Sequence, residues 1–204
     1  MKTVNSILSK AAKHWYLYLV WFLVVFLSWE LICRVLIQIP KEEKLVVFVG
    51  SQDCDTDGLK GKLEDNMQEY LKQVDVYYYA SENNYFGTLL QLYSTKADLF
   101  ILPESKATEA IPYYLELDIE KVKHSFGNVE FYQSEGKFLG IKIYDYESDT
   151  GKLKEYISYY NQEVVPKENY YLFFNKESLH LGSWNDCLTD GAVVLMEVMW
   201  KNEE

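Results

Sequence analysis

The sequence predicts an α/β domain attached to a single transmembrane helix. A predominantly apolar stretch runs from Trp15 to Ile39, and short β-rich runs alternate with helix-period segments after Pro40. Hydrophobic residues make up 49% of the chain, so it can bury enough apolar surface to offset the entropy lost on folding. Residues 40–204 are expected to form one domain, because they are too few for two full cores.

The apolar stretch at residues 15–39 is long enough to cross a hydrocarbon core roughly 30 Å thick. A cleaved signal peptide has a shorter apolar run followed by small residues, so we expect a retained anchor. The charged residues before the stretch are all basic, namely Lys2, Lys10 and Lys13. The positive-inside rule therefore predicts a single-pass protein of the cell membrane, with residues 1–14 in the cytoplasm and residues 40–204 outside.

Two charged residues, Glu30 and Arg34, interrupt the apolar stretch. Their i to i+4 spacing allows the two side chains to meet on one face of the helix. Charges near the end of a span either pair with each other and reach toward the headgroups, or bind polar groups of a neighbouring helix. Glu30 and Arg34 are therefore candidate partner-binding residues.

After Pro40 the pattern predicts a β-α-β-α-β unit with parallel strands. Residues 45–49 form a continuous apolar run, which is typical of a strand buried on both faces. The next expected elements are a helix at 57–71, a strand at 74–79, a helix at 85–93 and a strand at 98–102. We expect a mainly parallel sheet in a three-layer-like arrangement.

The second half of the domain is less regular. A helix is expected at 106–115, interrupted near Pro112, and a weak helix at 152–160. Strands are expected at 129–132, 138–144 and 170–174, and a last helix starts near Thr189.

The charge of the chain is divided unevenly. Of the net charge of −11, residues 1–40 contribute +3, from four basic residues and one acidic residue, which leaves −14 on residues 41–204. A domain this acidic repels nucleic acid and anionic lipid headgroups. Nucleic acid is therefore excluded as a partner.

Three segments resemble a known family. They are ADLFILPES at residues 97–105, GKFLGIKIYD at 136–145 and YYLFFNKESLHLGSWND at 170–186. The first two resemble the first lobe of type 2 extracellular solute-binding proteins of ABC importers. The third resembles segments of small membrane-anchored relatives encoded beside sugar importers.

The resemblance implies a transport role, but only one lobe can be fitted. A complete binding protein of this type closes two lobes around its ligand, and a second lobe does not fit between Gly140 and Tyr170. A lone lobe favours a docking subunit over an independent ligand carrier. We therefore expect an accessory protein that works with an importer permease or a solute-binding protein.

The most specific local motif is a candidate calcium loop. Asp53, Asp55, Asp57, Gly58 and Glu64 fit the spacing D-x-D-x-D-G-x5-E of an EF-hand loop. Alternate carboxylates around a glycine turn can supply the hard oxygen ligands that Ca²⁺ needs. The same residues can instead cap the following helix, since carboxylates suit a helix N-terminus. Both readings remain open, and the first makes an extracytoplasmic sensor or calcium-responsive module the alternative function.

Two further features bear on binding and oxidation. Trp184, in the loop Gly-Ser-Trp-Asn-Asp, is the best candidate for an exposed aromatic side chain that contacts a partner or a sugar ring. Cys33 lies in the apolar stretch, whereas Cys54 and Cys187 lie in the domain. If the strand at 45–49 and the strand ending near Asn175 are neighbours in the sheet, the loops that hold Cys54 and Cys187 could meet at one sheet edge and form a disulfide, so whether the two thiols pair stays open.

No catalytic constellation is recognisable. His124 and His180 have no partner at a metal-ligand spacing, and the sequence holds no Walker loop, G-x-S-x-G or H-E-x-x-H motif. We expect His180, between two leucines, to be a half-buried strand residue. The expected function is therefore non-enzymatic.

Overall fold

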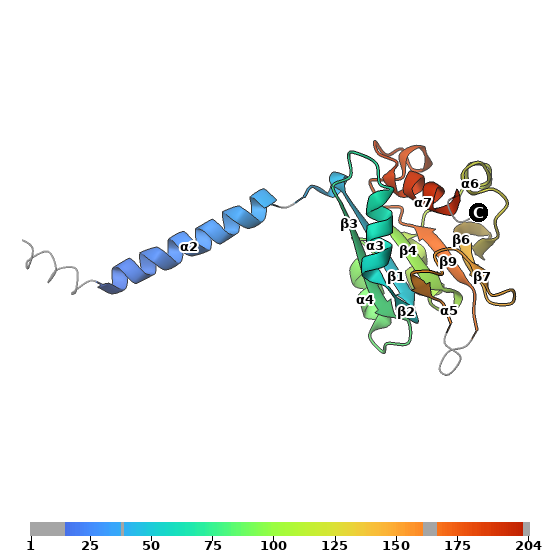
Figure 1. The fold of residues 1–204 in the computed structure, drawn as a ribbon, viewed down its shortest axis with the longest axis horizontal. Helices are drawn as coiled ribbons and strands as arrows, with labels where there is room; N and C mark the ends of the chain where they lie inside the picture. The colour runs from blue at the N-terminus through green and yellow to red at the C-terminus, as the bar shows by residue number, and fades with distance from the viewer. Residues whose placement is uncertain (1–14, 38, 161–166, 202–204) are drawn as a thin grey trace, which may run out of the picture. The chain divides into compact units, whose positions relative to one another are not determined.

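The computed structural model describes residues 15–37, 39–160 and 167–201 (Figure 1). The chain consists of two compact units, with the boundary between Ile39 and Pro40. The first contains helix α2 (Trp15–Ile37), and the second contains the α/β domain.

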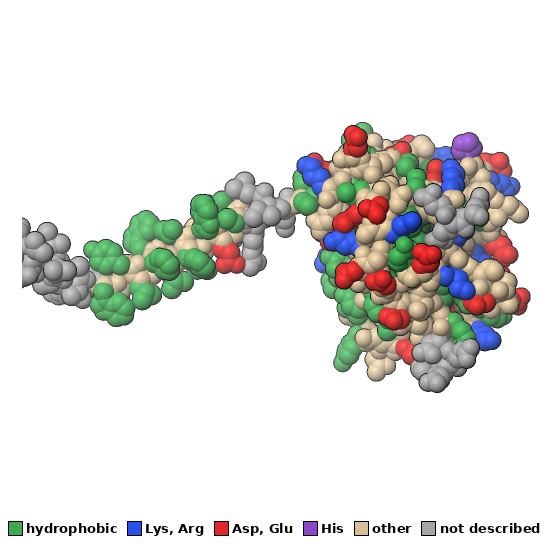
Figure 2. Space-filling model, in the orientation of Figure 1, with side chains coloured by type: hydrophobic (Ala, Val, Ile, Leu, Met, Phe, Trp, Pro, Cys, Tyr) green, Lys and Arg blue, Asp and Glu red, His purple; other side chains and the backbone are tan. Residues whose placement is uncertain are grey.

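Helix α2 has the length and composition of a membrane span. Its segment Trp15–Cys33 has a mean hydropathy of 2.0, and none of it is buried. Apolar side chains follow the helix along its length (Figure 2). A helix that is apolar on all sides and unburied is suited to lipid.

The first half of the domain forms the predicted β-α-β-α-β unit. After the short turn η1 (Lys41–Glu43), its elements are β1 (Lys44–Ser51), α3 (Thr56–Asp65), β3 (Gln73–Ala80), α4 (Phe86–Tyr93) and β4 (Leu99–Pro103). Strand β1 pairs in parallel with β3 on one side and with β4 on the other. The prediction of parallel strands is confirmed for this unit, although α3 ends at Asp65 instead of continuing to residue 71.

The second half extends the sheet with antiparallel strands. The order in the sheet is β3-β1-β4-β9-β6-β5, and the strand pairs from β4 to β5 are antiparallel. The whole sheet is therefore mixed, with its parallel strands in the first half of the chain. The remaining bounds are α5 (Glu104–Ala107), η2 (Thr108–Tyr113), α6 (Ile119–Phe126), β5 (Phe131–Ser134), β6 (Lys137–Asp145), β7 (Thr150–Gly151), β9 (Tyr170–Phe174), η3 (Gly182–Trp184) and α7 (Gly191–Lys201).

Two predictions for this half are wrong in detail. The helix expected at 106–115 is the short α5 followed by the 3-10 helix η2, which contains Pro112 and has a non-helical Ala110. The weak helix expected at 152–160 is a series of turns, and it includes β8 (Ile157–Ser158), which pairs with β2 (Asp53–Cys54) in a small second sheet. The sequence analysis did not predict α6.

Buried side chains form two clusters, one on each face of the sheet. Alternate residues of β1 point to opposite faces. Val47 belongs to a cluster with residues of α3, α6 and α7, and Phe48 belongs to a cluster with residues of α4 and η2. In Figure 1, α3 and α4 accordingly lie on opposite sides of the sheet. Burial on both faces explains why β1 reads as a continuous apolar run.

The two ends of the sheet are distinguished by the direction of its parallel strands. We call one the carboxyl-end edge, because β1, β3 and β4 all end there. The antiparallel pairing of Pro103 with Tyr170, and of Tyr144 with Tyr170, brings the start of β9 and the end of β6 to the same edge. We call the other the amino-end edge, where the chain enters the domain through η1.

We predict that two leucines of α4 respond very differently to truncation. Leu90 is fully buried, whereas 53% of the Leu92 surface is exposed. Leu90→Ala should lower the free energy of unfolding by about 2 to 5 kcal/mol, because it leaves a cavity. Leu92→Ala should cost less than about 1 kcal/mol. Urea denaturation of the full chain in detergent measures both values, and similar losses would contradict the observed packing of α4.

Candidate functional site at the carboxyl end of the sheet

A polar cavity lies at the carboxyl-end edge. Its volume is about 500 Å³, and it is open to solvent. The loop between β3 and α4, the first turn of α4, the helices that follow β4 and the segment before β9 all contribute to it. The lining residues are Ser81, Glu82, Asn83, Asn84, Gly87, Ser105, Lys106, Glu109 and Glu168. Ligands of α/β sheets bind outside the carboxyl ends of the parallel strands, which is where this cavity lies.

The most deeply buried lining residue is Ser81, which is 4% exposed. Its backbone N–H donates to the carbonyl of Ser51 at 3.0 Å, and its hydroxyl accepts from Gln52 Nε2 at 3.2 Å. The ends of β1 and β3 are therefore joined under the cavity. Tyr170 is also fully buried at this edge, and burial raises the pKa of its hydroxyl.

Ion pairs and hydrogen bonds fix the opposite wall. Lys106 Nζ lies 3.4 Å from Glu109 Oε1. Glu168 accepts from the backbone N–H of Ser105 at 2.8 Å and from its hydroxyl at 3.1 Å. A Cβ on Gly87 would lie 2.6 Å from Glu109 Oε2, so glycine allows this carboxylate to approach α4 closely. The wall is held by contacts between segments that lie far apart in the sequence.

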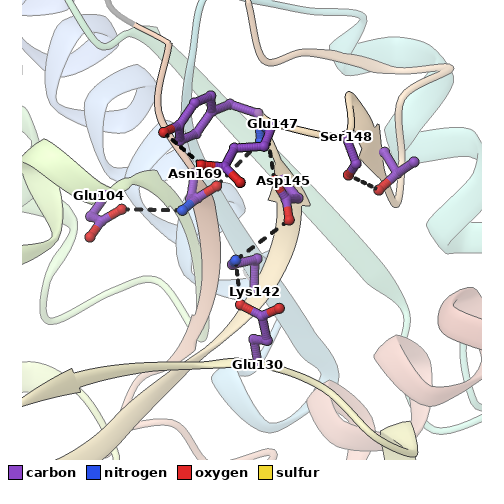
Figure 3. A network of polar contacts seen from close by, with 9 residues as sticks. Glu104, Glu130, Lys142, Asp145, Glu147, Ser148 and Asn169 are labelled. Atoms are coloured by element: carbon purple, nitrogen blue, oxygen red, sulfur yellow. Dashed lines mark hydrogen bonds and ion pairs between the residues drawn. The ribbon is translucent and has the colours of Figure 1, made fainter.

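A polar network supports the cavity wall from the side of β6 (Figure 3). Lys142 forms an ion pair with Glu130 and lies 3.7 Å from Asp145. The backbone N–H of Glu147 donates to Asp145 at 2.8 Å and holds the pKa of that carboxyl below its usual range. Asn169, next to Glu168, contacts Glu104 at 3.5 Å. The network therefore positions the turn after β6 and the segment that carries Glu168.

The lining is rich in hydrogen-bond acceptors. Glu82, Glu109 and Glu168 face one basic residue, Lys106, so the lining has a net charge of −2. Carboxylates accept hydrogen bonds only, whereas the amides of Asn83 and Asn84 both donate and accept. Tyr85, which is 72% exposed, directly follows Asn84 in the sequence. Such a lining suits a small polar molecule with several O–H or N–H donors.

The four acidic residues of the candidate calcium loop do not surround a common point; they are spread over different elements. Asp53 lies in β2, Asp55 precedes α3, and Asp57 and Glu64 lie within α3. Asp57 and Glu64 are seven residues apart, so about 10 Å of helix axis separates their Cα atoms. Glu64 lies 3.7 Å from Lys60. Over the described residues, no group of three His, Cys, Asp or Glu side chains is placed to hold a metal ion.

The alternative reading of the acidic loop is observed directly. Asp55 is the N-cap of α3, and its Oδ1 accepts from the backbone N–H of Gly58 at 2.9 Å. Asp57, in the first turn, suits the positive end of the helix dipole. Calcium binding by all four carboxylates would require the start of α3 to unwind, and it stays a prediction.

The three candidate partner-binding residues, Glu30, Arg34 and Trp184, differ in how far their side chains are exposed and described. Glu30 lies on α2 with an exposed side chain, whereas the Arg34 side chain falls outside the described residues. Trp184 is half-buried, and its ring centroid lies 5.1 Å from that of Phe174 and 6.0 Å from that of Phe126. The prediction of an exposed Trp184 is therefore wrong, because this ring packs against the core.

The condition for Cys54 and Cys187 to meet is not fulfilled, because β4 lies between β1 and β9 in the sheet. All three cysteines are free, including Cys33. Cys54 lies beyond the end of β1, whereas the Cys187 thiol contacts the Ser178 carbonyl near the amino-end edge. The eight residues of β1 span roughly 25 Å between these edges. Burial is the main cause that raises the pKa of Cys54 to about 12, and the negative charges of Asp53 and Asp55 add to it.

A buried polar cluster occupies the amino-end edge. His180 is fully buried in a loop and not half-buried in a strand as expected, and its Nε2 lies 3.1 Å from the carbonyl oxygens of Lys41 and Lys44. Asp98 is 7% exposed, and its side chain accepts from the backbone N–H of Val46 and from the Ser178 hydroxyl. Burial raises the pKa of Asp98. The His180 ring therefore bonds the entering chain, and the Ser178 hydroxyl bonds Asp98.

Sequence reasoning missed the residues of the cavity. The segment Ser-Glu-Asn-Asn at residues 81–84 directly follows a predicted strand. Together with the rule that ligands bind at the carboxyl ends of parallel strands, this segment could have indicated the site. Glu109 and Glu168 carry no such signal, because only the tertiary fold brings them to the same edge.

Comparison with models of known protein families, with curated protein sequences and with solved structures finds no match. The resemblance to solute-binding proteins therefore stays an expectation drawn from short sequence segments.

We predict that calcium, if bound, stabilises the folded domain by mass action. At free calcium of about 100 times the dissociation constant, the gain would be roughly 2.7 kcal/mol. Extracellular calcium modules bind at about 0.1 to 1 mM, so a thermal melt should extend to tens of millimolar calcium. The gain should disappear in Glu64→Ala, which removes one ligand and leaves the cap at Asp55 intact. An unchanged melting temperature, or an equal rise in this variant, would leave helix capping as the only role of the loop.

Proposed function

We propose that this chain is a membrane-anchored, non-enzymatic accessory protein of an ABC importer. In this proposal α2 spans the cell membrane with residues 1–14 in the cytoplasm. The domain forms a three-layer arrangement like one lobe of a solute-binding protein, on the outer side of the membrane. It uses the carboxyl-end cavity to contact the importer permease, the solute-binding protein or the small polar solute that they carry.

The observation that carries the proposal is the position of the cavity. It lies at the carboxyl-end edge, whereas the chain enters the domain at the amino-end edge. Strand β1, with eight residues, separates the two edges by roughly 25 Å. A domain attached at one edge is free to present the other edge to a partner.

The chemistry of the cavity supports a polar solute such as a sugar. Carboxylates and amides around an open cavity can accept and donate several hydrogen bonds to hydroxyl groups. Next to the lining residue Asn84 in sequence, the exposed Tyr85 offers an aromatic ring of the kind that packs on a sugar ring. The cavity has only one lobe around it within the described residues, so it suits a shared interface better than complete enclosure of a ligand.

The described histidines support binding over catalysis. The His180 ring is buried and engaged with backbone carbonyls, and His124 is exposed on α6. General base catalysis requires a base within hydrogen-bond reach of its nucleophile. Ser178, the buried serine nearest in sequence to His180, bonds Asp98 at 2.6 Å instead.

We predict that the carboxyl-end edge contacts importer components in the native membrane. A photo-crosslinking amino acid replaces Asn84 at the cavity, and a matched control places it at His124. The full chain is irradiated in cells, and its adducts are identified by mass spectrometry.

The position-84 variant should yield adducts with a permease or a solute-binding protein of an ABC importer. The position-124 variant should not. Identical adducts from both positions, or adducts of position 84 that include no import protein, would contradict the proposed function.

A further inference from the structure

Two exposed leucines stand out at the amino-end edge. Leu188 is completely exposed, at 104%, and Leu179 is 42% exposed. Both belong to the segment between β9 and α7. The Thr189 hydroxyl donates to the Leu179 carbonyl at 2.7 Å, so the chain at residues 188–189 lies beside residue 179. The leucines thus belong to one fixed part of the surface.

This part of the surface is bonded to the chain that enters the domain. The fully buried ring of His180 places Nε2 at 3.1 Å from the carbonyl oxygens of Lys41 and Lys44. Its Nδ1 lies 2.9 Å from Thr189 Oγ1. The ring therefore connects the entering chain to the residues that flank both leucines.

The covalent chain limits how far this surface can lie from the end of α2. Helix α2 ends at Ile37 and η1 begins at Lys41, so only four residue steps separate them. An extended chain covers at most about 3.6 Å per residue, or about 14 Å in total. The headgroup region on each side of a bilayer is about 5 to 8 Å thick. If α2 crosses the membrane, the amino-end edge is held within reach of the interface.

We propose that Leu179 and Leu188 insert into the outer interface of the lipid bilayer. This inference rests on the proposed function, because it requires α2 to span the membrane. Insertion removes two apolar side chains from water, and α2 already confines them to the bilayer surface. The contact fixes the amino-end edge at the membrane, so that the domain is held at two points and not by a loose tether.

The charges beside the leucines define the kind of lipid surface. The segment that carries them has three exposed acidic residues, Glu177, Asp186 and Asp190, and an exposed lysine, Lys176. Two further exposed lysines lie nearby, Lys41 in the entering chain and Lys121, which donates to the Ser183 carbonyl. The local charges are mixed, and the net charge of −14 on residues 41–204 repels anionic headgroups. The contact is therefore apolar, and a bilayer of zwitterionic phosphatidylcholine is sufficient for it.

The inference is tested with an environment-sensitive fluorophore on the full chain in phosphatidylcholine nanodiscs. The label is attached to Leu188→Cys after Cys33, Cys54 and Cys187 have been replaced by serine. Its emission should move to shorter wavelength, and lipids that carry a spin label near the headgroup should quench it. Replacing part of the phosphatidylcholine with phosphatidylglycerol should not increase the quenching.

Two matched labels separate the possible failures. A label on Asn84→Cys, at the opposite edge, should remain in water and unquenched. A label on Val25→Cys in α2 should be quenched by lipids that carry the spin label deep in the acyl chain. If position 25 is quenched while position 188 stays in water, the inference is overturned and the anchor stands.

Two other results are also decisive. An emission shift at position 188 without quenching by lipid would show that another protein copy covers the leucines, which overturns the lipid contact. An unquenched position 25 would instead contradict the membrane anchor of the proposed function.

Discussion

The arrangement of the sheet depends on the hydrogen bonds that the buried residue Asp98 forms with Val46 and Asn175. Its Oδ2 accepts from the backbone N–H of Val46 at 2.8 Å, and its own N–H donates to the Val46 carbonyl at 2.8 Å. Its carbonyl accepts from the N–H of Asn175 at 2.9 Å. One residue thus joins β1, the start of β4 and the end of β9. This is the place where the sheet changes from parallel to antiparallel pairing.

The same cluster connects the sheet to the chain that enters the domain. The Ser178 hydroxyl donates to Asp98 at 2.6 Å and accepts from the backbone N–H of His180 at 3.1 Å. The His180 ring then bonds the carbonyls of Lys41 and Lys44. A buried polar network is stable only when its members are satisfied, and this one is completed by the entering chain itself. The amino-end edge is therefore the fixed side of the domain, and the carboxyl-end edge is left for binding.

Much of the fold followed from local patterns, whereas the site did not. The apolar run in β1 and the helix periods of α3 and α4 are local signals, so the parallel unit was predicted correctly. Strand β9 was expected at residues 170–174, but its antiparallel place between β4 and β6 depends on contacts that are distant in sequence. The cavity draws on separate segments, and no periodicity links Ser81 to Glu168. Trp184 was assigned to the surface because its neighbours are polar, but its ring turns inward onto Phe174.

The most direct test of this account is the pH dependence of stability at Asp98. Burial raises its pKa in the folded state. The stability that the protonated form contributes is complete below the unfolded pKa and is lost as pH rises through the folded pKa. Asp98→Asn keeps a carbonyl oxygen that can accept from Val46 and cannot ionise, and its amide group reverses the bond to Ser178, which then accepts instead of donating.

Urea denaturation of both full chains between about pH 4 and about pH 8 gives the difference in their free energies of unfolding. We predict that this difference moves in favour of the Asn variant as pH rises. A difference that stays constant, or that moves in favour of Asp98, would contradict a raised pKa of the buried Asp98 side chain at the junction of the two halves of the sheet.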